Sequence, residues 1–290
     1  MVVEKVNMSN IALITDSTCD IPEKYIQQYN ITVLPHTIIW GLETYRDRID
    51  ITPEAFYQRL LEDKQMPTTA QVSAHAYYDA FMDAKKKGYE QILVYTISGA
   101  MSGAINSARE AAAECDIPVE IVDGKGPTMS LGWQVLTAAR LREAGETLQT
   151  ILDKTKAIRD SMVQLVMLDT LEFLHRGGRI GNAQKLIGSL LDIKPIVRIN
   201  HQTGLVEPDS QARTYKKAVM LLYKRFFGQL DLGMTLHVAV LHGNAIESAK
   251  QLMDWIEKEI HPYEMILNIT GPVLGINTGP GALALCGYFD

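Results

Sequence analysis

The stretch that decides the fold is QILVYTISGAMSGAINSAREAAAECDIPVEIVD, residues 91–123. Its first seven residues, Gln91 to Ile97, are a short apolar and β-branched run of the kind that forms a buried strand. Ser102 to Glu114 follows with the spacing of a helix, and Val119 to Asp123 is a second strand. A strand, a helix and a strand in this order predict two parallel strands joined by a crossover helix.

The same alternation continues on both sides of this unit. Ile11 to Thr15 predicts a buried strand, and Ile31 to Trp40 predicts extended segments around Pro35. Thr52 is a natural helix N-cap, and Pro53 suits the first helical position. We therefore expect an N-terminal α/β domain with a mostly parallel sheet covered by helices. Those helices are expected from Pro22 onward and over residues 53–61, 73–87, 128–144 and 147–160.

The second half of the chain repeats this pattern as a second α/β domain. The boundary is expected near Ser161, where two helices give way to a new strand, so the predicted domains are residues 1–161 and 162–290. The turn His201-Gln-Thr-Gly204 predicts a hairpin. Strands are expected over residues 163–168, 195–200, 204–207, 236–241 and 265–269, and helices over residues 181–191, 213–230 and 246–260.

Composition excludes several classes of protein. The formal charge of −6 over 290 residues leaves no basic excess to neutralise the phosphates of a nucleic acid. No apolar run approaches the ~20 residues of a membrane span, and residues 1–10 have no apolar signal core. The three cysteines are far apart and fit neither a disulfide scaffold nor a metal site. The cytoplasm is the expected compartment.

Three loops rich in small hydroxyl residues follow or precede predicted elements: Thr15 to Thr18, Pro67 to Gln71, and Ser98 to Gly103. In α/β sheets, ligands bind beyond the carboxyl ends of the strands, where loops enter helices. Helix N-termini offer unpaired N–H donors, which together with neutral hydroxyls suit a carboxylate or a phosphate. The commoner role of such residues is to cap a helix or form a turn.

Two glycine-rich stretches are candidates for functional loops. Leu174 to Gly181 places two arginines around a Gly pair, which suits either a solvated surface turn or a binding loop. Gly271 to Gly281 combines several Gly and Pro residues ahead of the apolar run Ala282 to Leu285, and it predicts a tight loop that closes a pocket.

Motifs of common enzymes are absent from the sequence. There is no P-loop, no dinucleotide-binding fingerprint, no Gly-x-Ser-x-Gly and no His-Glu-x-x-His. His175, His201 and His242 lie where each could contact a ligand, although a structural role is commoner. An enzyme acting on a small anionic substrate through Asp16, Ser102 or Arg179 remains an alternative.

Taken in order, the segments resemble the DegV family of fatty-acid-binding proteins over essentially the whole chain. The matching pieces are Thr15-Asp-Ser-Thr-Cys-Asp-Ile-Pro22, Pro67-Thr-Thr-x-Gln71, Ile97-Ser-x-x-Met-Ser-Gly103, Leu171-x-x-Leu-x-Arg-Gly-Gly-Arg-Ile180, Lys194-Pro195, Arg213-Thr214, and Gly271-Pro272 ahead of Gly279-Pro-Gly281. The resemblance implies a two-domain fold with a long-chain fatty acid buried between the domains.

The resemblance also implies roles for individual residues and for a partner. A separate fatty acid kinase would phosphorylate the bound carboxylate, so this chain would be a carrier rather than an enzyme, without a cofactor or metal. The carboxylate would be held by Thr68, with Thr69, and by Ser102 and Asn277. Ser98 and Gly103 would support the loop, Arg179 matches the family's Gly-Arg-Ile loop, and Arg213 matches an arginine near the entrance that faces the kinase.

Three positions depart from the family pattern. Asn277 stands near the place of a usual histidine, Ala70 replaces a serine after the threonine pair, and Gly99 replaces the second serine of a pair. Asparagine forms hydrogen bonds but does not change charge near neutral pH. A divergent lipid-binding protein without kinase coupling is therefore a further alternative.

Overall fold

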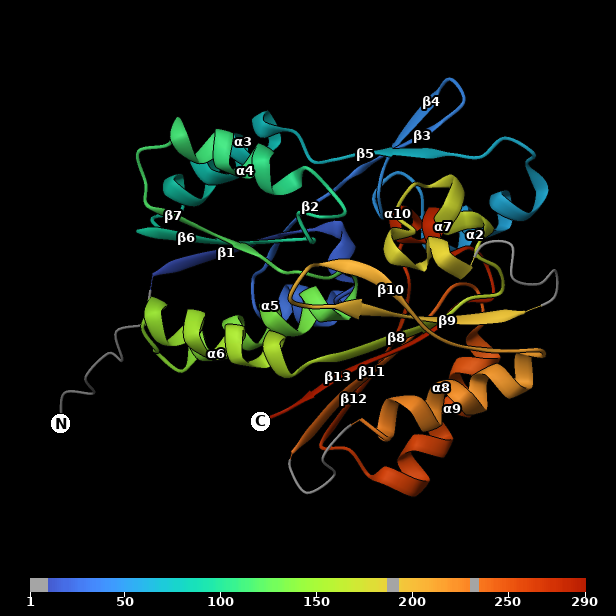
Figure 1. Ribbon diagram of the computed structural model, residues 1–290. Helices are drawn as coiled ribbons and strands as arrows, with labels where there is room; N and C mark the ends of the chain where they lie inside the picture. Colours follow the sequence, from blue (N-terminus) through green and yellow to red (C-terminus); the bar gives the residue numbers. More distant parts are fainter. Residues whose placement is uncertain (1–9, 187–192, 230–234) are drawn as a thin grey trace.

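The computed structural model describes residues 10–186, 193–229 and 235–290. These residues form two larger sheets and one small sheet, with helices on the outer faces and α5 between the larger sheets (Figure 1). The larger sheets are built from segments before and after Ser161, as the strand order shows. The proposed division into domains at that residue stays a prediction.

The N-terminal sheet is fully parallel, with the order β2-β1-β6-β7. One face packs on α3 and α4, where Tyr77, Phe81 and Ala108 are fully buried. The opposite face packs on α5 and α6 (Figure 1). The bounds are β1 Ile11–Asp16, β2 Thr32–Leu34, β6 Gln91–Thr96, β7 Val119–Asp123, α1 Glu23–Gln28, α3 Ala74–Lys86, α4 Ala104–Ala113, α5 Met129–Glu143 and α6 Leu148–Ser161.

The second large sheet has six strands in the order β10-β9-β8-β13-β11-β12, and only β11 and β12 pair in parallel. Helices α8 and α9 cover one face. The other face packs toward α5, which lies between the two sheets and is buried along most of its length (Figure 1). The bounds are β8 Val163–Met167, β9 Lys194–Asn200, β10 Leu205–Ala212, β11 Leu236–His242, β12 Glu264–Ile269, β13 Leu283–Phe289, α8 Tyr215–Phe227 and α9 Ile246–Ile260.

A small antiparallel sheet of order β4-β3-β5 was not expected from the sequence. Its inner side packs on α2 and α10 through Ile38, Trp40, Phe56 and Ile276, so early and late parts of the chain share one core cluster. The bounds are β3 Thr37–Trp40, β4 Glu43–Arg46, β5 Thr68–Ala70, α2 Pro53–Glu62 and α10 Pro272–Thr278.

Most predicted elements are confirmed, and four segments differ. Gly271 to Gly281 was expected to be a loop, but Pro272–Thr278 is helix α10. Its apolar residues Val273 and Ile276 are buried against α2 and β3, and this burial favours the helix. Ala282 to Leu285 leads into β13, a strand absent from the prediction.

The loop between Leu174 and Gly181 also begins as a helix, α7, Glu172–Arg176. Of the helix expected at 181–191, residues Gly181–Leu186 form a 3-10 helix, η2, and the remainder lies outside the described residues. Residue 230, the last of the helix expected at 213–230, and residues 1–9 of the expected signal-free N-terminus lie outside them as well.

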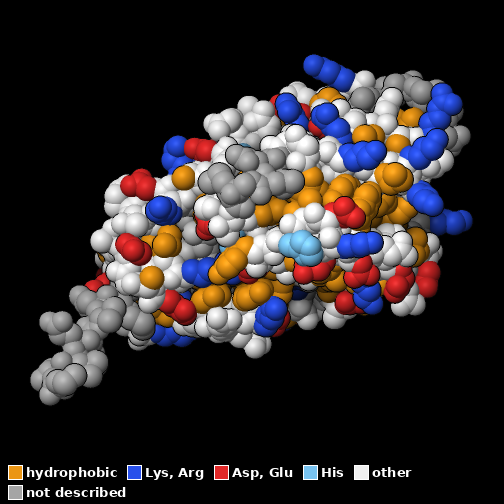
Figure 2. All heavy atoms as spheres, turned by 90° about the horizontal axis from the view of Figure 1, so that it is seen from below, with side chains coloured by type: hydrophobic (Ala, Val, Ile, Leu, Met, Phe, Trp, Pro, Cys, Tyr) orange, Lys and Arg blue, Asp and Glu red, His pale blue; other side chains and the backbone are white. Residues whose placement is uncertain are grey.

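Charges of both signs are interspersed on the face shown in Figure 2, around a band of hydrophobic side chains. Among the helices of the described residues, none has the length and apolar character needed to cross a membrane.

Candidate functional site

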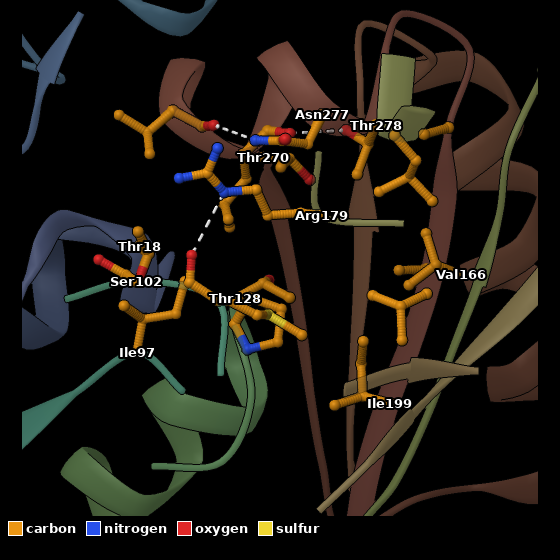
Figure 3. Close-up of a pocket in the computed structure, with 18 of the residues that line it drawn as sticks. Thr18, Ile97, Ser102, Thr128, Val166, Arg179, Ile199, Thr270, Asn277 and Thr278 are labelled. Atoms are coloured by element: carbon orange, nitrogen blue, oxygen red, sulfur yellow. Dashed lines mark hydrogen bonds between the residues drawn. The ribbon is translucent and has the colours of Figure 1, made fainter. Parts of the chain in front are cut away.

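A cavity of about 340 Å³ lies between the inner face of the six-stranded sheet and the loops that follow β1 and β6. This volume falls within the range of small-molecule sites, roughly 300–1,000 Å³. Its walls divide into an apolar side and a polar end (Figure 3).

The apolar side is the face of the sheet turned away from α8 and α9. Because side chains alternate along a strand, Val166 and Leu168 point to the cavity, while Leu165 and Met167 join the core beneath the helices. The neighbouring strands continue the wall in the same way. Its further residues include Val197, Ile199, Val206, Leu241 and Ala284.

The polar side chains come from distant segments: in Figure 3, Asn277 and Thr278 lie at one end, Arg179 lies next to them, and Ser102 lies beyond Arg179 near Thr18; Thr69 also lines the cavity. Together they offer hydroxyls, one amide and one guanidinium. This combination can hold an anionic head group while the tail lies along the apolar wall.

Ser102 stands where β6 leads into α4. Its Oγ accepts a hydrogen bond from the backbone N–H of Ala104, the first residue of α4, at 3.2 Å, and Ser102 also lines the cavity. With that lone pair engaged, the hydroxyl hydrogen is available to donate to a ligand oxygen.

Gly103 has a packing role in this loop. A Cβ there would lie 2.3 Å from Oε1 of Gln71, whose Nε2 donates to Ser107 Oγ at 2.9 Å. The close approach that Gly103 permits is therefore that of the Gln71 side chain, which also lines the cavity.

Asn277 lies on α10 and faces the turn after α7. Its Nδ2 donates to the Val273 carbonyl oxygen at 3.1 Å, whereas its buried Oδ1 has no partner within the described part of the chain. A Cβ on Gly177 would lie 2.1 Å from that Oδ1. Because Gly177 has no side chain, the amide of Asn277 can occupy this space.

Arg179 is exposed but lines the mouth of the cavity. Its Nε donates to the Met101 carbonyl oxygen at 3.3 Å, and its Nη1 donates to the Gly177 carbonyl oxygen at 2.7 Å. These contacts hold a positive charge beside Ser102, without burying it.

The structure separates Thr68 from Thr69. In β5, Thr69 and its neighbour Ala70 line the cavity, whereas Thr68 is exposed and does not. Ser98 is buried away from the cavity lining and donates to the Gly204 carbonyl oxygen at 2.9 Å. Arg213 is exposed just before α8 and does not line the cavity.

His36 is a lining residue that the sequence did not single out. It is 3% exposed, and neither ring nitrogen has a hydrogen-bond partner among the described residues. Burial lowers the pKa of His36, against the opposing effect of Asp16, whose Oδ1 lies 3.8 Å from the ring Nδ1. Asp16 itself accepts from the backbone N–H groups of Thr18 and Ile97.

A second buried carboxylate fixes the segment before α10. Asp20 accepts from Arg48 and from the backbone N–H of Gly271, and Arg48 also donates to the Ile269 carbonyl oxygen. The turn after β1 and the N-terminus of α10, the helix that carries Asn277, are thereby tied together. Over residues 10–186, 193–229 and 235–290, no group of three His, Cys, Asp or Glu residues could hold a metal ion.

Comparison with known proteins identifies relatives along the whole chain. A family model described as "Uncharacterised protein, DegV family" matches residues 10–290. Protein DegV of Bacillus subtilis is 30% identical over 282 residues, covering 97% of this chain and 99% of that protein.

Solved structures are similar over the same length. The structure described as "Fatty Acid Binding of a DegV family Protein from Thermus thermophilus" is 31% identical, with a TM-score of 0.90 over 97% of this chain and 99% of that one. Bacillus subtilis DegV, described as a fatty acid binding protein, is 30% identical, with a TM-score of 0.89 over 97% and 100%.

Proposed function

This chain belongs to the DegV family, and from that premise we propose that it binds one long-chain fatty acid in the cavity between its sheets and presents the carboxylate to a fatty acid kinase. The observation that carries the proposal is the division of one cavity into an apolar wall and a polar end. The related proteins described as fatty acid binding support it.

Energetics favour this ligand class. Burying about a dozen methylenes at ~0.8 kcal/mol each yields a gross gain on the order of 10 kcal/mol. Ordering costs reduce this gain considerably, but the tail still supplies most of the affinity. The head group can then be held by a few neutral donors, and its oxygens stay accessible to a phosphoryl donor.

At the polar end, we assign the carboxylate to Thr69, Ser102 and Asn277, with Arg179 at the mouth. Ser102 contributes its free hydroxyl hydrogen, and Asn277 has a second Nδ2 hydrogen beyond the one bonded to Val273. Thr68, on the outer side of β5, would act only by shaping this strand.

The binding proposal is tested by native mass spectrometry of the protein purified from a bacterial host, followed by titration of delipidated protein with oleate and palmitate. We expect an added mass that matches a fatty acid and saturable binding of one equivalent. The proposal would be refuted if the purified protein carried no lipid and bound neither oleate nor palmitate.

The kinase step needs its own experiment. We propose a cytoplasmic kinase partner, and the assay combines loaded protein, ATP and a purified bacterial fatty acid kinase. Formation of acyl phosphate only in the presence of this chain is the expected result. Binding without turnover would instead support a lipid-binding protein without kinase coupling, and Asn277→His would then show whether a histidine restores turnover.

The alternative of an enzyme for a small anionic substrate predicts phosphatase or esterase turnover that is lost in Ser102→Ala. Both oxygens of Asp16 already accept hydrogen bonds from the chain, which favours a structural role for this carboxylate over a catalytic one.

A further inference from the structure

The apolar side of the cavity contains one amide side chain, that of Gln164. It is 1% exposed and lines the cavity, yet neither Oε1 nor Nε2 has a hydrogen-bond partner in the described residues. Buried polar groups in native proteins are nearly always paired. An unpaired amide facing a ligand cavity therefore points to a polar partner on the ligand.

Gln164 lies far from the head-group end. Gln164, Val166 and Leu168 lie on the same face of this segment, which is the face toward the cavity. Gln164 is about 13 Å from Leu168 along the chain, because each of the four residues advances ~3.3 Å. Val166 pairs with Val197 of β9, and the same register places Gln164 beside Ile199. In Figure 3, Ile199 lies at the opposite end of the cavity from Asn277 and Thr278.

The neighbours of Gln164 do not explain the amide. In the strand on the other side, β13, the residue paired with Gln164 is Cys286, and the Cys286 Sγ contacts the Met162 sulfur. A plain hydrocarbon tail would leave both amide atoms unpaired, and a leucine of similar size would pack there without that loss.

A second polar side chain lies close to this end. His201 is in the turn directly after β9, two positions beyond Ile199. It is 7% exposed, and its Nε2 has no partner among the described residues. Because His201 does not line the cavity, Gln164 is the polar group that a ligand would contact on this wall.

We propose that the distal end of the cavity recognises a hydroxyl group on the acyl chain, so that the preferred ligand class is a hydroxylated long-chain fatty acid. A hydroxyl both donates and accepts, as does the primary amide of Gln164, and the two groups can satisfy each other. This inference rests on the proposed fatty-acid site and specifies its ligand.

The test compares oleate with ricinoleate, which differs from oleate by one hydroxyl past the middle of the chain. Delipidated protein is titrated with each acid. We expect ricinoleate to bind about tenfold more tightly, equivalent to about 1.4 kcal/mol. Gln164→Leu should abolish or reverse this preference, because oleate gains an apolar neighbour and ricinoleate loses its partner.

The matched control is Ile199→Val on the same wall, which should weaken both acids by a similar factor and leave their ratio unchanged. Melting of the ligand-free protein is a second readout. Gln164→Leu should not lower the melting temperature, since it removes a buried unpaired amide; a clear decrease would mean that Gln164 is structural and would overturn the inference.

The possible failures are distinguishable. If the wild-type protein binds neither acid, the proposed fatty-acid function fails. If it binds oleate as tightly as ricinoleate, the fatty-acid site stands and the hydroxyl-recognition inference is refuted, whether or not the Gln164→Leu protein folds.

Discussion

The guanidinium of Arg179 donates a hydrogen bond to the carbonyl oxygen of Met101, and this contact joins the glycine-rich turn after α7 to the loop that enters α4. The two segments come from opposite halves of the chain. Both border the polar end of the cavity, so one side chain positions a charge and links the two walls of the mouth.

Arg179→Ala should weaken fatty-acid binding by about three- to tenfold, because an exposed charge contributes modestly and is screened by salt. The loss should shrink as ionic strength rises. Isothermal titration at low and high salt measures it. Arg213→Ala is the control, since Arg213 lies away from the cavity; an equal loss in both variants would contradict a specific role for Arg179.

Ser102→Ala should reduce affinity for oleate by about tenfold, since it removes a hydroxyl donor to the carboxylate worth on the order of 1–2 kcal/mol. Ser98→Ala removes a buried hydroxyl that bonds the Gly204 carbonyl oxygen outside the cavity lining. It should lower stability and leave affinity unchanged. Affinity loss confined to Ser98→Ala would contradict the assignment.

Gly177→Ala should destabilise the ligand-free protein by about 1–3 kcal/mol in urea unfolding, through overpacking. The backbone φ of −70° at Gly177 suits alanine, so the cost comes from the contact with Asn277 Oδ1. Asn277→Ala should therefore recover much of the loss in the double variant. Additive losses in the double variant would show that the contact is not the cause.

Asp47 should make stability depend on pH. Burial raises its pKa to about 7 from an ordinary value of 3.8, although Ser17 Oγ donates to its Oδ2. The unfolded state therefore ionises first, and the stabilising contribution of the neutral carboxyl, fully present below pH 3.8, is lost as pH rises through 7.

For each pH unit between these two pKa values, the free energy of unfolding falls by about 1.4 kcal/mol. Asp47→Asn keeps an acceptor for Ser17 and removes the titration. Urea unfolding of both proteins between pH 5 and 8 measures the difference in their free energies of unfolding. Relative to the wild type, the variant should become more stable as pH rises. Parallel profiles would show that Asp47 ionises normally.

The sequence alone determined the local architecture. The alternation in residues 91–123 predicted β6, α4 and β7 because a buried parallel strand and its crossover helix have distinct spacings. Thr52 and Pro53 likewise marked the start of α2, where the Thr52 Oγ1 accepts from Ala55 N–H. The motif series also predicted a family that the whole-chain comparison confirms.

Only the tertiary structure decided which residues face one another. Gly275 looked like part of a loop, but in α10 it lets Phe56 approach, since a Cβ there would lie 2.7 Å from that ring. Thr69 rather than Thr68 lines the cavity, at a strand whose place depends on pairing with the distant strand β3. Gln164 and His36 carry no local signal at all. They become candidates for ligand contact because their polar atoms are buried without a hydrogen-bond partner among the described residues. That burial arises only when strands distant in sequence pack around one cavity.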